Sequence, residues 1–350
     1  MQNSHLHYMS LALELAKRGR LTVSPNPMVA CVIVKEGQII GQGWHEFPGQ
    51  AHAEVNALRE LGDQAQGATA YVSLEPCCHT GKTPPCTKAL IEAGIQSVYV
   101  ACLDPNPLVA GKGVQALLQA GIQVTTGICE SEAIALNKIF FHYMQTKRPY
   151  VISKWAMSLD GKTITHNQDD RAISGDDSLT HSHETRQIVD AIVIGARTAI
   201  HDNPQLTVRR VETAKHPLRF ILAGRENLPF NLKLFDASLP AKTIVIVPDD
   251  INQAWLQAAK NKHIEVWKCA RKDGKIDLND FLDQLGSAGV TSLLVEGGET
   301  LHASFFREKL VKQIQVYLAP KIISQLEKKL QLSAMTMQTL GEDIFLETTL

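Results

Sequence analysis

Two short segments in the first quarter of the chain contain residue types that bind metal ions. Residues 52–54 read His-Ala-Glu, and residues 75–86 read Glu-Pro-Cys-Cys-His-Thr-Gly-Lys-Thr-Pro-Pro-Cys. Zinc prefers imidazole and thiolate ligands, and a catalytic zinc keeps three protein ligands and one open position. His52, Cys77 and Cys86 would supply those ligands. We expect Cys86 to begin a helix, where the helix dipole stabilises a thiolate.

Glu54 has the right type and position to move protons at such a site. It follows His52 by two residues, so it can lie beside the metal without being a ligand. Taken alone, His-Ala-Glu is better explained as the start of a helix with a capping carboxylate. Together with the proline-cysteine segment, it is the pattern of zinc-dependent nucleobase deaminases.

The cysteine segment departs from the common deaminase spacing. A second cysteine three positions after Cys77 would stand at residue 80, which is Thr80. Cys86 lies farther on, after a longer loop, so Cys78 and His79 are rival ligands. We favour Cys77 because it directly follows the proline, and we expect Cys78 to pack nearby.

The composition places these segments in an ordinary globular protein. The chain has 350 residues, 44% of them hydrophobic, with 35 Lys and Arg against 36 Asp and Glu. This length predicts two domains, and the balanced charge argues against a partner such as long nucleic acid. No run resembles a membrane span or a secretory signal. The seven cysteines are an odd number, so we expect a reducing, cytoplasmic location rather than a disulfide framework.

Hydrophobic periodicity predicts alternating strands and helices in both halves of the chain. The first half has expected strands at 29–34, 38–41, 70–73, 97–101 and 123–126, and helices from residue 6, near 52, at 86–93, at 114–120 and at 130–145. Pro149 ends the last helix, which predicts domains 1–147 and 148–350. The second half has expected strands at 151–154, 191–195, 219–222, 243–247, 264–267, 292–295 and 315–318. This order predicts α/β domains, the second with a mostly parallel sheet.

Further motifs in the first half resemble a known family. The motifs are Ser-Pro-Asn-Pro-Met-Val at 24–29, Gly-Trp-His at 43–45 and Asp-Pro-Asn-Pro-Leu-Val at 104–109. With the long cysteine loop, they resemble the deaminase half of the bifunctional riboflavin-biosynthesis family, diaminohydroxyphosphoribosylaminopyrimidine deaminase/5-amino-6-(5-phosphoribosylamino)uracil reductase (RibD or RibG). The resemblance implies a cytidine-deaminase-like three-layer domain. It also implies that the substrate pyrimidine or its ribose phosphate is bound by Asn26, His45, His79, Lys82, Asp104 and Asn106.

Plainer interpretations of these residues stay open. Asn26 and Asn106 lie in proline-rich segments and could cap turns, and His45 could lie on the surface at a strand end. Lys82 is the natural phosphate candidate, because it lies in a Gly-Lys-Thr loop. That loop is not a P-loop, since the glycine expected five residues earlier is Pro76.

The second half carries four motifs that resemble the reductase half of the same family. They are residues 154–162, 195–199, 202–209 and 295–301, the last reading Val-Glu-Gly-Gly-Glu-Thr-Leu. The resemblance implies a dihydrofolate-reductase-like α/β domain that uses NADPH. The residues it implies for the cofactor are Ala156, Thr198, Asp202, Gly298, Glu299, Thr300, Leu301, His302, Ala303 and Ser304. Those it implies for the substrate are Lys154, Arg186, Leu206, Arg209 and Glu296, whose cations suit a phosphate.

The resemblance as a whole implies a homo-oligomeric enzyme with two reactions on one small pyrimidine ribose phosphate. Zn²⁺ and Glu54 would deaminate the ring, and NADPH would reduce the ribose to a ribityl chain. Two alternatives remain. One is a deaminase of another base. The other is a deaminase whose second half is a lapsed reductase serving only oligomerisation or binding. Ala172 favours the second, because family members often have tryptophan there.

Overall fold

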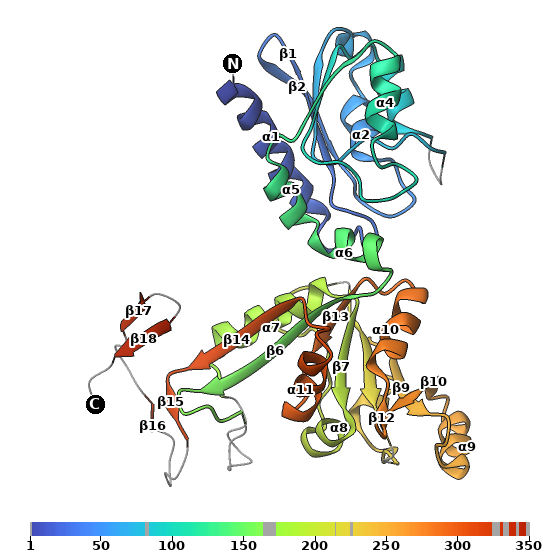
Figure 1. The fold of residues 1–350 in the computed structure, drawn as a ribbon, viewed down its shortest axis with the longest axis vertical. Helices are drawn as coiled ribbons and strands as arrows, with labels where there is room; N and C mark the ends of the chain where they lie inside the picture. The colour runs from blue at the N-terminus through green and yellow to red at the C-terminus, as the bar shows by residue number, and fades with distance from the viewer. Residues whose placement is uncertain are drawn as a thin grey trace. The chain divides into compact units, whose positions relative to one another are not determined.

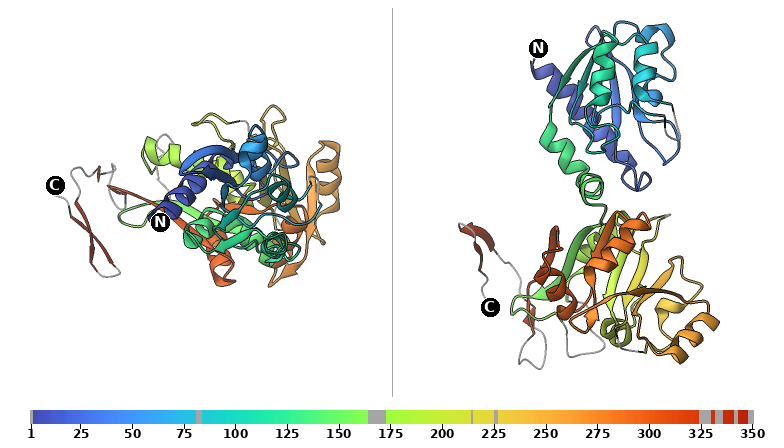
Figure 2. Two further views of the ribbon diagram at one scale, coloured as in Figure 1. Left: turned by 90° about the horizontal axis from the view of Figure 1, so that it is seen from above. Right: turned by 45° about the vertical axis from the view of Figure 1, so that its right-hand side comes forward.

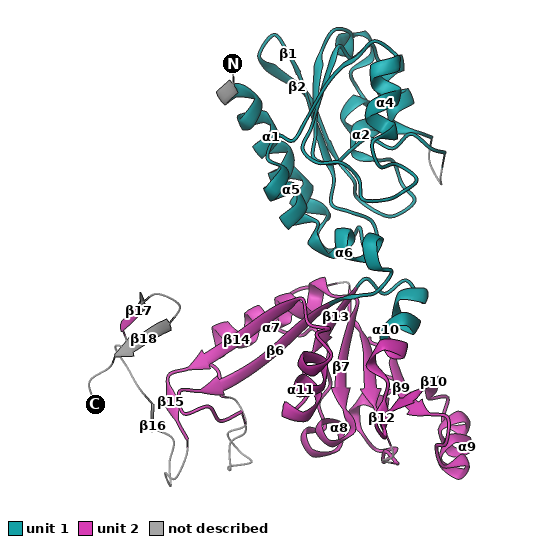
Figure 3. Ribbon diagram, in the orientation of Figure 1, with its two compact units in different colours: residues 1–150, 282–291 teal, residues 151–281, 292–350 magenta. Residues whose placement is uncertain are grey.

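The computed structural model describes residues 2–80, 84–163, 173–213, 215–224, 227–323, 330–331, 336–340 and 343–347. Its contacts divide the chain into two compact units (Figure 3). Unit 1 is residues 1–150 with 282–291, and unit 2 is residues 151–281 with 292–350. The domain boundary placed after residue 147 stays a prediction. Among the described residues, no helix is long and apolar enough to cross a membrane.

Unit 1 is built on a five-stranded sheet with strand order β2-β1-β3-β4-β5. β1 pairs antiparallel with β2 and β3, whereas β3–β4 and β4–β5 are parallel. The strands are β1 (Ala30–Lys35), β2 (Gln38–Trp44), β3 (Thr69–Val72), β4 (Ser97–Val100) and β5 (Gln123–Thr126). The helices are α1 (Gln2–Ala16), α2 (Ala53–Leu58), α3 (Cys86–Glu92), α4 (Lys112–Gln119), α5 (Glu130–Leu136) and α6 (Lys138–Thr146), with 3₁₀ turns at Lys17–Gly19 and Gly62–Ala65.

Helices cover both faces of this sheet (Figures 1 and 2). One face packs on α2, α3 and α4 through a core that includes Ala57, Leu90 and Leu117. The other packs on α1, α5 and α6 through a core that includes Met9 and Phe140. The α/β fold class and the three-layer first domain are therefore confirmed. The loops that follow β2 and β3, together with the first turns of α2 and α3, carry the candidate metal ligands.

The single helix predicted over 130–145 is wrong in one respect. The structure has two helices, α5 and α6, separated at Asn137. The buried Asn137 side chain accepts a hydrogen bond from the Met28 amide at 2.8 Å and donates one to the Met28 carbonyl at 2.9 Å. Its backbone leaves helical geometry, with φ −106° and ψ 23°. Asparagine bonds readily to nearby backbone groups, which disfavours it inside helices. Periodicity could not show that the partner would lie more than a hundred residues away.

Unit 2 is built on a seven-stranded sheet with order β10-β9-β8-β7-β13-β6-β14. The pairs β10–β9, β9–β8, β8–β7, β7–β13 and β6–β14 are parallel, which confirms the predicted mostly parallel sheet. Its strands are β6 (Tyr150–Ser158), β7 (Ala191–Gly195), β8 (Leu218–Leu222), β9 (Thr243–Pro248), β10 (Glu265–Cys269), β13 (Ser292–Val295) and β14 (Gln313–Ala319). β7 and β13 read as unbroken apolar runs because helices bury both faces of a parallel sheet.

Among the residues described after 150, five helices and several short elements accompany this sheet. The helices are α7 (Asp176–Ile188), α8 (Ala196–Asp202), α9 (Gln253–Asn261), α10 (Leu278–Ser287) and α11 (Glu299–Arg307), with a 3₁₀ turn at Lys233–Phe235. The short strands are β11 (Arg271–Lys272), β12 (Lys275–Ile276), β15 (Lys321–Ile322), β16 (Leu330–Gln331), β17 (Thr336–Leu340) and β18 (Asp343–Glu347). The residues that the resemblance assigns to the reductase site lie on β6, α7 and α8, in the loop after α8, directly after β13 and in the first turns of α11.

Candidate functional site

The structure brings the three favoured metal ligands together in unit 1. The ligand atoms of His52, Cys77 and Cys86 all lie within 4.8 Å of one another. His52 Nδ1 is 3.3 Å from Cys86 Sγ and 3.5 Å from Cys77 Sγ. His52 precedes α2 in extended backbone, Cys86 is the first residue of α3, and Cys77 lies in the segment after β3. Two helix starts and one loop thus aim one imidazole and two sulfur atoms at a common point.

The electrostatics of this cluster suit a bound cation. Hydrogen bonding from the Cys86 thiol, supported by His52 and by the Cys86 amide, lowers the pKa of Cys77 to about 4. The Cys86 amide donates to Cys77 Sγ at 3.3 Å. The shared proton and burial raise the pKa of Cys86. The donor set of two sulfurs and one imidazole, with ligand atoms within 4.8 Å of one another, fits zinc.

Glu54 lies in the first turn of α2 with its side chain buried. Burial, and then the charge of Cys77, raise the pKa of this carboxyl group. A buried carboxyl group at such a position can accept a proton and return it. The structure places this carboxyl group beside the ligand Cys86, and its role in proton transfer stays a prediction.

The two rival ligands lie outside this cluster. Cys78 is hydrogen bonded through its thiol to the Leu108 carbonyl at 3.9 Å. His79 has a buried Nδ1 that finds no hydrogen-bond partner among the described residues. This unpaired nitrogen is compatible with a substrate contact, and the role of His79 stays a prediction. Lys82 lies outside the described residues.

Asn26 and His45 form a connected pair next to His52. His45 Nδ1 lies 3.3 Å from the Ala51 carbonyl, and its Nε2 lies 3.0 Å from Asn26 Nδ2. Burial lowers the pKa of His45. Since the Asn26 amide nitrogen can only donate, the ring accepts at Nε2 and donates from Nδ1 to the carbonyl. The ring is 3% exposed, so the interpretation of His45 as a surface residue is wrong. It also packs edge-on against the His52 ring, with 5.2 Å between centroids.

Asp104 and Asn106 lie in the loop after β4 and shape their own turn. Asp104 Oδ1 accepts from the Asn106 amide at 2.8 Å, and Asn106 Oδ1 accepts from the Leu108 amide at 3.1 Å. The turn-capping interpretation is thus correct for Asn106. Burial, together with Glu75 and Cys77, raises the pKa of Asp104 to about 6. Their contact with substrate stays a prediction.

In unit 2, Glu296 joins two of the predicted substrate cations. The Arg186 guanidinium donates two hydrogen bonds of 2.7 Å to its carboxylate, and Lys154 Nζ lies 3.3 Å away. The Glu296 side chain is only 7% exposed. Burial raises its pKa, but Arg186 and Lys154 outweigh burial and hold the pKa well below its usual range. This ion cluster orders the centre of the predicted reductase site.

The segment 203–209 runs past this cluster and is fixed by several side chains. The Arg186 guanidinium donates to the Thr207 carbonyl at 3.3 Å, and the Arg209 amide donates to His183 Nδ1 at 3.1 Å. Leu206 is buried in left-handed backbone with φ 53°, a costly conformation that the surrounding contacts hold. Arg209 itself is exposed, so its guanidinium is available to an anion.

The predicted cofactor residues gather at the start of α11. The Gly298 amide donates to Thr198 Oγ1 at 3.2 Å, and His302 Nδ1 lies 2.7 Å from Ser153 Oγ. Gly298 precedes α11 in extended backbone, and Glu299 to Ser304 form its first turns. A helix N-terminus after two glycines fits the phosphate groups of a dinucleotide. Ala156 lies on β6 and Asp202 ends α8, whereas Ala172 lies outside the described residues.

Three buried groups were missed from the sequence. They are Glu75, which accepts hydrogen bonds from the loop after β4, and His183 and Arg219, which bond to the segment 203–209. Arg219 donates to the carbonyls of Gln205, Leu234 and Ala241. Each forms hydrogen bonds with backbone groups that are distant in the sequence, so residue type and spacing could not predict these roles.

Acidification is expected to weaken unit 2 through His183. Burial, then the charges of Arg186 and Arg209, lower the pKa of His183 to about 4, against about 6.5 in an unfolded chain. Between these values the unfolded chain binds more protons, so stability falls as pH drops from 6.5 to 4, by on the order of 2 kcal/mol. Denaturant unfolding across this range checks it. His183→Gln should flatten the dependence, and an unchanged pH profile in that variant would contradict the assignment.

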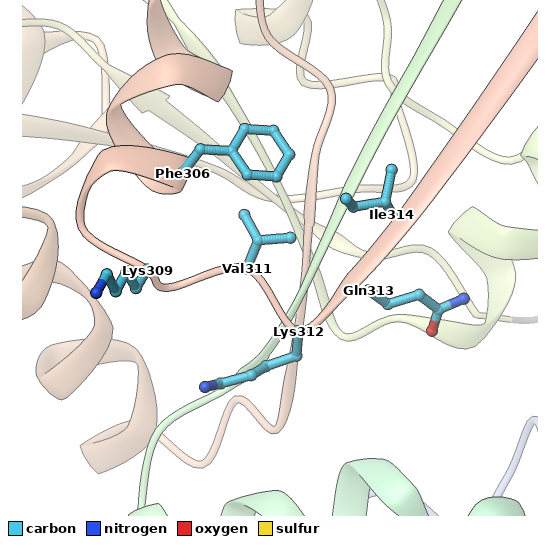
Figure 4. A pocket seen from close by; sticks show the side chains of 6 residues that line it. All are labelled: Phe306, Lys309, Val311, Lys312, Gln313 and Ile314. Carbon is cyan, nitrogen blue, oxygen red and sulfur yellow. The ribbon is translucent and has the colours of Figure 1, made fainter. Parts of the chain in front are cut away.

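A pocket of about 270 Å³ lies elsewhere on unit 2 (Figure 4). It is lined by Phe306, Lys309, Val311, Lys312, Gln313 and Ile314. None of these is a predicted site residue. The pocket therefore does not mark the chemistry described above.

Comparisons with known proteins cover both halves of the chain. The family model "RibD C-terminal domain" matches residues 149–346, and "Cytidine and deoxycytidylate deaminase zinc-binding region" matches residues 2–102. "Riboflavin biosynthesis protein RibD" of Actinobacillus pleuropneumoniae is 40% identical over 98% of this chain and 94% of its own length. The protein of the same name from Aquifex aeolicus is 41% identical over 97% and 96%.

Solved structures agree with these matches. The chain is similar to Acinetobacter baumannii RibD, form 1, with a TM-score of 0.82 and 38% identity over 99% of this chain and 98% of that one. It is also similar to a diaminohydroxyphosphoribosylaminopyrimidine deaminase/5-amino-6-(5-phosphoribosylamino)uracil reductase from Thermotoga maritima. That structure gives a TM-score of 0.80 and 33% identity over 98% and 97% of the two chains.

Proposed function

The chain belongs to the RibD family of riboflavin biosynthesis proteins, and we propose which of its residues perform the family's two reactions. It is a bifunctional enzyme with a zinc-dependent deaminase and an NADPH-dependent reductase. The match of the reductase family over residues 149–346 does not support the alternative of a lapsed second half. It equally disfavours a deaminase that acts alone on another base.

For the deaminase, we assign the metal to His52, Cys77 and Cys86, whose ligand atoms converge within 4.8 Å. This convergence beside the buried Glu54 is the observation that carries the proposal. Zinc held by these residues would lower the pKa of a water molecule so that it could attack a ring carbon at neutral pH. Glu54 accepts the proton from that water and returns protons to the departing ammonia. Asn26, His45, His79, Lys82, Asp104 and Asn106 hold the pyrimidine or its ribose phosphate.

For the reductase, we assign the substrate to the side of unit 2 that contains the Glu296 cluster. Lys154, Arg186 and Arg209 supply positive charge that suits a ribose phosphate. NADPH held at the N-terminal end of α11 would supply the hydride that converts the ribosyl group to ribityl. Ala156, Thr198, Asp202 and the segment from Gly298 to Ser304 orient this cofactor. Glu296 keeps Arg186 and Lys154 in fixed positions while the ring opens.

We further propose a cytoplasmic homo-oligomer that acts on a small-molecule substrate. No cysteine among the described residues is in a disulfide, which suits a reducing compartment. The exposed apolar side chains Ile314, Val316 and Leu318 on the last strand of the unit 2 sheet support self-association. Sedimentation of the purified chain at several concentrations tests the oligomer.

An assay with the diaminopyrimidine ribotide tests the function as a whole. We expect one ammonia released and one NADPH oxidised for each molecule converted. After metal removal with a chelator, ammonia release should stop, while NADPH oxidation with the deaminated ribotide should continue, because the two sites use different cofactors. Adding back Zn²⁺ should restore ammonia release. NADPH oxidation that fails in the untreated enzyme would refute the reductase, and ammonia release that survives chelation would refute the metal assignment.

A further inference from the structure

We propose that Glu75 is a positioning residue of the deaminase, which holds the loop formed by residues 103–111 against the metal-ligand segment. This loop carries Asp104 and Asn106, the predicted substrate contacts. The inference rests on the proposed deaminase function and assigns a role to a residue outside the predicted metal ligands and substrate contacts.

One buried carboxylate accepts four backbone hydrogen bonds from this region. Glu75 Oε2 accepts from the amides of Asp104 at 3.2 Å and Gly111 at 2.9 Å. Its Oε1 accepts from the amides of Gly113 at 2.9 Å and Val114 at 3.1 Å. Glu75 is only 4% exposed. A single side chain thus joins both ends of the loop to the end of β3.

The arrangement requires a carboxylate rather than any polar group. Gly113 and Val114 lie in the first turn of α4, whose preceding residue Gly111 has no side chain to cap it. The N-terminal end of a helix has unpaired amides and favours negative charge. Glutamine has one acceptor oxygen, and its NH₂ group would face two of the four donors.

Close packing also connects the start of α4 to the segment before Cys77. A Cβ atom at Gly113 would lie 2.1 Å from the Pro76 carbonyl oxygen and 3.1 Å from Glu75 Oε1. The start of α4 therefore touches the two residues immediately before Cys77. The start of α4, at the end of the loop, is thus in direct contact with the segment that carries this ligand, and Glu75 sets the distance between ligand segment and substrate loop.

Glu75 is also connected to the predicted substrate contacts Asp104 and Asn106 through the backbone. Its amide bonds to the Cys102 carbonyl at 3.0 Å, and Asp104 follows two residues later. Asp104 then orders Asn106 through its own carboxylate. Loss of the Glu75 carboxylate would free the loop that carries Asp104 and Asn106. The hydrophobic core on the sheet is built from other residues and would stay in place.

Steady-state kinetics of Glu75→Gln tests this proposal. We expect the KM for the diaminopyrimidine ribotide to rise by about tenfold or more, the effect of losing one hydrogen bond to a charged group, with kcat changed less. Zinc content and NADPH oxidation with the deaminated ribotide should stay at the wild-type level. Gly113→Ala adds a methyl group against Pro76 and Glu75 from the side of α4, and it should raise the same KM.

Val98→Ala is the matched control, because it removes buried side-chain volume from the unit 1 core on β4 without touching the loop. It should lower the amount of active protein but leave KM unchanged. A wild-type KM in Glu75→Gln would overturn the proposal. So would a lower apparent kcat with an unchanged KM, which is the result expected for Val98→Ala. If Glu75→Gln does not yield folded protein, Glu75→Asp, which keeps the charge but cannot span all four amides, is judged by the same criterion. Absence of deamination in the wild-type enzyme would instead refute the proposed function.

Discussion

Glu54→Gln is expected to reduce the kcat of deamination by about 10²–10⁴-fold, the usual contribution of a general acid and base. The side chain keeps its size, so the buried site beside His52 should keep its shape. The amide can neither accept the proton of the attacking water nor return protons to ammonia. Ammonia release from the diaminopyrimidine ribotide is the measurement. NADPH oxidation with the deaminated ribotide should be unchanged, because the reductase residues belong to unit 2.

Glu60→Gln is the control for this substitution. Glu60 is an exposed residue just after α2, so its loss removes the same charge from the same part of the chain without touching the site. It should have wild-type activity in both assays. Zinc content should be normal in both variants. An equal loss of both activities in Glu54→Gln, or a loss of zinc, would contradict a separate proton-transfer role.

The grouping of the three candidate metal ligands was predictable because a few residue types at short spacing carry the signal. His52 and Glu54 share a helix start, and cysteine is rare enough that a proline-cysteine segment stands out. Choosing Cys77 over Cys78 rested only on the adjacent proline, and the structure groups Cys77 with His52 and Cys86. Cys86 lies farther along the chain than the common deaminase spacing has it. It still joins the other two ligands, because α3 begins at Cys86 and places its side chain beside them.

The strands were predictable for a similar reason. A buried parallel strand such as β7 (Ala191–Gly195) is an unbroken apolar run bounded by polar or glycine residues, and its limits show directly in the sequence. Less regular features were not predictable. The break at Asn137 depends on its bonds to Met28, and the role of Glu75 depends on amides near residues 104–114. Such partners are set by tertiary packing, which no local pattern contains.

Glu296→Gln is expected to be the most damaging single substitution in unit 2. It leaves the side chains of Arg186 and Lys154, 12% and 14% exposed, without their negative partner. Removing one member of a buried ion pair costs about 3–5 kcal/mol, because an unpaired charge remains buried. We expect a lower melting temperature of unit 2 and loss of NADPH oxidation, with ammonia release preserved. Asp176→Asn, which breaks the exposed pair with Arg210, should cost about 0–1 kcal/mol.

A double-mutant cycle separates the stability contributed by the Arg186–Glu296 ion pair from the stability that Glu296 contributes through other contacts. Arg186→Gln alone leaves the Glu296 carboxylate with Lys154 only, and Arg186→Gln with Glu296→Gln leaves a buried pair of amides that can bond to each other. If the pair is the stabilising element, the double variant should be more stable than the sum of the single losses predicts, by about 1–3 kcal/mol. NADPH oxidation should stay low in it, because the cation needed by the phosphate is gone. Additive losses would mean that Glu296 stabilises unit 2 through other contacts.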